Sequence, residues 1–153
     1  MLNKKFLLSA PIFVLVLVVG VSALDTVHTP AKGSAERNGI MDGLRAEYKE
    51  MSGNDGRAFR GAITFNVTFL KVHNGWAWIY AEPQSTDSRD VFGENSGFLL
   101  QLEAGRWNVK SLPKPVDDPD DPENLDYPSN KDVKNIRRAY PGVPSDIFPS
   151  HDS

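Results

Sequence analysis

Cysteine is absent from this 153-residue chain, and histidine occurs only three times. The absence of cysteine excludes a disulfide framework, a thiolate zinc site and a lipid anchor attached through cysteine. The HExxH, GxSxG and glycine-rich phosphate-loop motifs are absent as well. We therefore expect no cofactor and no metal centre of this kind, name no catalytic residue, and regard an enzymatic function as disfavoured but open.

The three histidines lie too far apart in the sequence to indicate a catalytic or metal site. His28 lies in a polar N-terminal stretch, and His151 is two residues from the end of the chain. His73 directly precedes an Asn-Gly pair, where an exposed or simply hydrogen-bonded ring is ordinary. A catalytic base needs partners within reach, and the sequence places none beside these three residues.

An excess of positive charge is also missing. The chain has 17 lysines and arginines against 20 aspartates and glutamates, for a formal net charge of −3. Nucleic-acid-binding domains normally carry a basic patch or stripe, so we expect no nucleic-acid partner.

Residues 1–23 have the pattern of an export signal. Lys4 and Lys5 precede an apolar run over residues 6–21, and Val21-Ser22-Ala23 fits a cleavage site. The run is short for a bilayer-spanning helix, which needs about 20 residues. We expect a cleaved signal peptide and a periplasmic or extracellular protein. The alternative is an uncleaved segment that anchors the protein to a membrane.

Four strand-like runs between Gly61 and Leu112 predict a sheet. Alternating apolar and polar residues begin at Ile63, and an aromatic-rich run begins at Trp76. An Asn-Gly pair separates these two runs, and Ala104-Gly105 separates the next two, so we expect two hairpins. The alternation changes phase near Phe69, which indicates either a bulge or burial on both faces.

A helix is expected over residues 35–51, after an N-cap at Ser34. Ile40, Leu44, Tyr48 and Met51 recur at helical spacing. Gly39 and Gly43 weaken this helix but would allow another backbone to approach closely. The fold class is therefore α+β: an N-terminal helix packed on a four-stranded antiparallel meander, plus a short C-terminal helix.

Composition divides the chain into five segments. They are the signal peptide at 1–23, a flexible tail at 24–33, the helix-plus-sheet core at 34–112, an acidic Asp/Pro-rich loop at 113–129, and a C-terminal helix and docking tail at 130–153. Ser129 to Asp132 resembles a capping box, and Ile147-Phe148-Pro149 is an apolar hook expected to dock on the domain.

The acidic loop is the only dense cluster of oxygen donors. Calcium takes six to eight oxygen ligands, which makes this loop a weak calcium candidate. No EF-hand spacing is present, so a solvated, extended loop is favoured over a metal site. The candidate ligands are Asp118, Asp120, Asp121 and Glu123.

Trp76, Trp78 and Tyr80 share one face of the second strand. An exposed row of rings could bind carbohydrate or peptide by stacking. We favour instead a core role beneath the N-terminal helix, with the alanines of the other face admitting a second layer. If a pocket exists between the helix and this strand, its expected ligand-binding residues are Asp42, Tyr48, Trp78 and Glu82.

Several motifs resemble a group of small exported bacterial proteins of unknown function. They are Glu36 to Arg45 (ERNGIMDGLR), Asn74 to Trp78 (NGWAW), Glu82-Pro83-Gln84, Gly105 to Val109 (GRWNV) and the closing Ile147-Phe148-Pro149. More loosely, a helix followed by a curved antiparallel sheet resembles the cystatin-like roll of nuclear-transport-factor-like domains. That resemblance implies a pocket between helix and sheet, but it carries no activity to this chain.

These observations favour a non-catalytic binding or interaction module of the bacterial cell envelope. The alternative is a small-ligand carrier or enzyme that uses the helix–sheet pocket, with Asp42 or Glu82 as a carboxylate of raised pKa. In a third version, the acidic loop and a basic face formed by Lys131, Lys134 and Arg138 dock on a partner. The expected partner is an unknown protein or small ligand, with membrane contact only through an uncleaved N-terminal segment.

Overall fold

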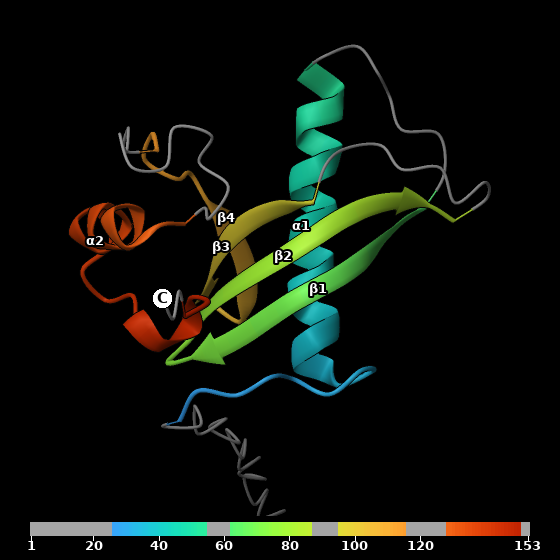
Figure 1. Ribbon diagram of the computed structural model, residues 1–153. Coiled ribbons are helices and arrows are strands. Elements are labelled where there is room, and N and C mark those ends of the chain that lie inside the picture. Colours follow the sequence, from blue (N-terminus) through green and yellow to red (C-terminus); the bar gives the residue numbers. More distant parts are fainter. Residues whose placement is uncertain (1–25, 55–61, 87–94, 116–127, 151–153) are drawn as a thin grey trace, which may run out of the picture.

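Four consecutive antiparallel strands form one sheet in the order β1-β2-β3-β4, with helices on both sides of it (Figure 1). The computed structural model describes residues 26–54, 62–86, 95–115 and 128–150. The elements are α1 (Ala35–Asn54), β1 (Ile63–His73), β2 (Trp76–Ser85), β3 (Ser96–Glu103), β4 (Arg106–Lys110), α2 (Asn130–Ala139) and the 3₁₀ turn η1 (Ser145–Ile147). This arrangement confirms the predicted α+β meander. The expected signal peptide, the calcium candidates and His151 lie outside the described residues.

Both hairpins close at the pairs that the sequence indicated. Asn74 and Gly75 have φ values of 49° and 72°, and Ala104 and Gly105 have 48° and 78°. Two successive positive φ values produce the turn whose twist matches that of paired strands. Ala104 accepts a conformation that asparagine or glycine adopts more readily.

A bulge in β1 changes which of its residues face α1. Val67 pairs with Ala81 and Phe69 pairs with Tyr80, so Thr68 is the extra residue. Before the bulge Phe65 and Val67 pack toward α1, and after it Leu70 and Val72 take that face. Phe69 therefore points to the opposite side. Of the two explanations offered for the phase change, the bulge is confirmed, and Phe69 is half-buried on the opposite face while Thr64 and Asn66 are exposed there.

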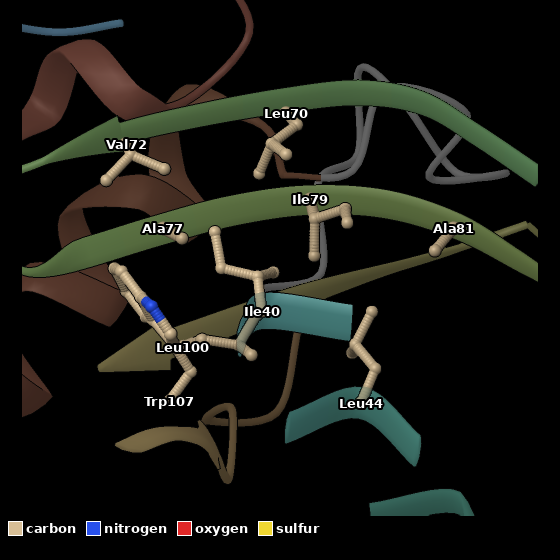
Figure 2. Packing of buried hydrophobic residues seen from close by; sticks show 9 residues of the cluster. All are labelled: Ile40, Leu44, Leu70, Val72, Ala77, Ile79, Ala81, Leu100 and Trp107. Atoms are coloured by element: carbon tan, nitrogen blue, oxygen red, sulfur yellow. The ribbon is translucent and has the colours of Figure 1, made fainter. Parts of the chain in front are cut away.

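The α1 face of the sheet holds the first hydrophobic cluster (Figure 2). Ile40 and Leu44 of α1 are fully buried against the strands, where small side chains on β2 leave room for them. The fully or nearly buried members are Ile40, Leu44, Leu70, Val72, Ala77, Ile79, Ala81, Leu100 and Trp107.

The opposite face carries a second cluster, covered by the C-terminal residues. Trp76 and Trp78 pack there with Leu99, and α2 and the following chain supply Ile136, Val143, Ile147 and Phe148. The expected core role of the tryptophans is confirmed, because the exposed fraction of Trp78 is 0%. The expected position of Trp76 and Trp78 beneath α1 is wrong: the face of β2 that lies under α1 carries Ala77, Ile79 and Ala81.

The C-terminal layer begins at the capping box expected from the sequence. The Ser129 hydroxyl accepts a hydrogen bond from the Asp132 backbone N–H at 3.2 Å, and the Asp132 carboxylate accepts one from the Ser129 N–H at 3.0 Å. Ile147 and Phe148 are buried, which confirms the docking of the apolar hook. The sheet is therefore the middle of three layers.

Candidate functional site

The structure does not bring the four expected ligand-binding residues together. Asp42 and Tyr48 lie on α1, whereas Trp78 and Glu82 lie on β2. Trp78 belongs to the cluster on the face away from α1, and Glu82 shares that face because side chains two residues apart on a strand point the same way. One pocket between α1 and β2 cannot be lined by all four.

The two residues on α1 have local partners. Asp42 pairs with Arg45 at 2.6 Å, and its side chain is 73% exposed. Tyr48 packs its ring against Phe65 and Phe98, with centroids 5.6 and 5.8 Å away. Burial raises the pKa of the Tyr48 phenol above its ordinary value of 10.0. Tyr48 therefore extends the core between helix and sheet, while Asp42 faces water.

Glu82 is part of a polar surface on the outer half of the β1–β2 ribbon. Its carboxylate accepts hydrogen bonds from the Asn66 amide at 3.5 Å and the Gln84 amide at 3.2 Å. Both amides donate to the same carboxylate oxygen, Oε2. Glu82 therefore lies in a hydrogen-bonded polar row, not in the apolar setting expected for a site carboxylate.

Two histidine–carboxylate pairs tie chain segments together. The Nδ1 atom of His73 lies 2.9 Å from the Asp146 carboxylate, which links the first hairpin to η1. His28 Nε2 lies 2.8 Å from Glu36 and links the N-terminal segment to α1. His73 is hydrogen-bonded, as expected, but the sequence carried no signal for its partner 73 residues away. Within the described ranges no three His, Asp or Glu side chains form a metal-binding group.

Lys131, Lys134, Arg137 and Arg138 form an exposed cationic face on α2. The other side of the helix is buried through Asp132 and Ile136. Asp132, the one acid of α2, is buried and forms the capping box with Ser129.

Two members of the cationic face lack a counter-charge within the described ranges. Among the residues that the structure describes, neither Lys134 nor Arg138 has an ion-pair partner. Arg137 uses its Nε atom to donate to the Val143 carbonyl at 3.1 Å. The basic side of α2 expected from Lys131, Lys134 and Arg138 is therefore exposed. The Asn135 side-chain amide of the same helix donates a hydrogen bond to the Lys114 backbone carbonyl at 3.4 Å, which brings Lys114 close to this side.

The fold and this surface define a small α+β domain: a helix, a four-stranded antiparallel meander and a C-terminal layer that displays cations. Comparison with protein-family models, with curated proteins and with solved structures finds no match for this chain. The resemblance to small exported bacterial proteins thus stays an expectation. In the part of the chain that the structure describes, each helix falls short of the length or the hydropathy needed to cross a bilayer.

Proposed function

We propose that this protein is an exported, non-catalytic interaction module whose cationic face on α2 binds an acidic segment of a partner protein. The observation that carries the proposal is the pair Lys134 and Arg138, exposed one helical turn apart with no counter-charge in the described part of the chain. Like charges at this spacing destabilise a helix by about 0.2–0.5 kcal/mol. An acidic partner removes that cost and adds charge-assisted hydrogen bonds.

The apolar parts of the sheet are less suited to a partner, because the chain itself covers them. α1 packs on one face, and Ile136, Val143, Ile147 and Phe148 pack on the other. Trp76 and Trp78 are thereby withdrawn from any stacking role on the surface. Binding then depends on groups that point outward, and on the cationic face Lys134 and Arg138 have no ion-pair partner among the described residues.

An acidic polypeptide fits this face better than a lipid surface does. Helices that bind bilayers insert an apolar side, and α2 turns its apolar residues inward. Ile136 is 1% exposed, and Val133 and Tyr140 pack against the same cluster. Cations alone contribute about 1 kcal/mol each at an anionic membrane, which gives weak, salt-sensitive attachment.

The test measures binding of a poly-glutamate peptide to the wild-type protein and to the Lys134→Glu/Arg138→Glu variant. We expect affinity to fall at least about tenfold, which corresponds to 1.4 kcal/mol. The matched control is Lys32→Glu/Arg106→Glu, which makes the same change in net charge at exposed positions elsewhere. An equal loss in both variants, or tighter binding to phosphatidylglycerol vesicles than to the peptide, would contradict the proposal.

Export is the second part of the proposal, and it is supported by the pattern of residues 1–23. Cleavage after Ala23 would remove two lysines and no acid and would leave a more acidic mature chain. The mass of the protein recovered from the producing cell separates a chain beginning at Leu24 from one that keeps its apolar segment.

A further inference from the structure

The outer edge of β1 presents unpaired backbone groups at Phe65 and Val67. The Thr86 N–H donates to the Ala62 carbonyl at 3.1 Å, so Ala62 is a residue whose backbone faces β2. Backbone direction alternates along a strand, which turns the groups of Ile63, Phe65 and Val67 away from β2. The Arg45 side chain confirms this, since its Nε donates to the Ile63 carbonyl at 3.0 Å.

The neighbouring part of the same edge is covered by the chain itself. His28 and Val72 exchange backbone hydrogen bonds of 2.9 and 2.8 Å, and the Thr29 hydroxyl donates to the Leu70 carbonyl at 2.9 Å. Part of the segment expected to be a flexible tail is therefore attached to β1, through one isolated β-bridge at His28. Its cover ends at Pro30, and among the residues that the structure describes the N–H and C=O groups of Phe65 and Val67 have no partner.

β4, at the opposite edge, is protected in the usual ways. It has five residues, begins and ends with a cation, and its Trp107 carbonyl lies against Gly43 of α1. Between Ile63 and Leu70 the β1 sequence ITFNVTFL contains no charge and no proline. Its only protection within the described residues is the Arg45 contact at Ile63 and the bulge at Thr68, and Phe65 and Val67 lie between these two points. A long, uncharged edge rich in β-branched and aromatic residues is a template for an added strand.

We propose that a second copy of this chain adds to this edge, with the two β1 strands antiparallel about a two-fold axis at Asn66. Phe65 of one copy then lies opposite Val67 of the other, and four backbone hydrogen bonds form, two for each such pair. The exposed groups are placed symmetrically about Asn66, so one sequence satisfies both sides, as an isologous interface requires.

The side chains of β1 are compatible with this pairing. On the α1 side, Phe65 and Val67 are half-buried, and the contact sets an aromatic ring beside a β-branched residue twice. On the other side, Thr64 and Asn66 are exposed and uncharged, so no like charges meet at the axis. The inference does not depend on the cationic face of α2.

The test uses charge at the axis, where the two copies of residue 66 are direct neighbours. Sedimentation equilibrium of the purified protein should show a dimer for the wild type. Asn66→Lys and Asn66→Asp should each raise the dimer dissociation constant at least about tenfold, because like charges lie directly opposite. An equimolar mixture of the two variants should recover the dimer as a heterodimer.

Asn108 on β4 provides the matched control, since it is an exposed asparagine on the other edge strand. Asn108→Lys and Asn108→Asp should leave the assembly unchanged. Asn66 also donates a hydrogen bond to Glu82, so each variant loses this bond as well as placing like charges at the axis. The mixture separates these two effects, because mixing restores charge complementarity between the copies but does not restore the bond to Glu82. A wild type that stays monomeric up to about 1 mM, or a mixture no more dimeric than its components, would overturn the proposal.

Discussion

Gly43 is the residue at which α1 comes closest to the sheet. A Cβ atom there would overlap the carbonyl oxygen of Trp107, which is backbone and cannot turn aside. At Gly39 the nearest atom is Cδ1 of the Trp107 ring, 3.1 Å from the added carbon, and a side chain can shift by a few tenths of an ångström. The close approach of another backbone is thus confirmed at Gly43, whereas at Gly39 the neighbour is a side chain.

We expect Gly43→Ala to lower the free energy of unfolding by about 1–3 kcal/mol, because the overlap outweighs the gain in helix propensity. Gly39→Ala should change it by less than about 1 kcal/mol, since the same propensity gain offsets a softer contact. Urea denaturation monitored by circular dichroism measures both. Equal stabilisation of the two variants would show that α1 is not held against β4.

At the scale of the element, the N-terminal segment is attached through His28. Its hydrogen bond with Glu36 is the main cause that raises the pKa of His28 above 6.5, opposed in part by burial. A raised folded-state pKa means that the stabilisation is complete below pH 6.5 and is lost as pH rises through the folded value. The segment that covers Leu70 and Val72 should therefore be held more firmly in mild acid.

NMR titration of the His28 ring should give a pKa above 6.5 in the wild type and a lower value in Glu36→Gln. Amide exchange at Val72, whose N–H donates to the His28 carbonyl, should be slower at pH 6 than at pH 8 after correction for intrinsic rates. His73 is the internal control, since its partner is Asp146. An unchanged His28 titration in Glu36→Gln would contradict this account.

At the scale of the whole molecule, the C-terminal residues are a structural layer. Phe148 lies with its ring centroid 5.0 Å from that of Trp78 and is 7% exposed. Phe148 and Trp78 are 70 residues apart in the chain and pack in the same hydrophobic cluster. The free energy of folding therefore depends on residues 128–150 as well as on the helix and sheet.

Phe148→Ala should lower the free energy of unfolding by about 3–5 kcal/mol, the usual cost of removing a buried ring. It should also shift tryptophan emission to longer wavelength, because water reaches Trp78. Leu102→Ala is the control: Leu102 is 43% exposed, so the loss should stay within about 0.5 kcal/mol. Matching losses in the two variants would mean that the C-terminal layer is not packed on the sheet.

Local pattern was enough to predict the elements. Alternation, the glycine turns and the capping box at Ser129 depend on residues close in the chain, and each appears where expected. Local pattern was not enough to bring the four expected ligand-binding residues into one pocket. Period-2 alternation puts Trp78 and Glu82 on one face of β2, but it cannot say which face α1 will cover.

The sequence by itself determined the order of the elements, the hairpin positions and the class of fold, because those follow from propensity and spacing. Only tertiary structure decided the assignment of faces: α1 rests on the alanine side of β2, since small side chains and Gly43 admit a helix there. Trp76 and Trp78 then pack against the C-terminal layer on the other face. Long-range packing also decided that the His28 segment covers the β1 edge at Leu70 and Val72, and that His73 meets Asp146.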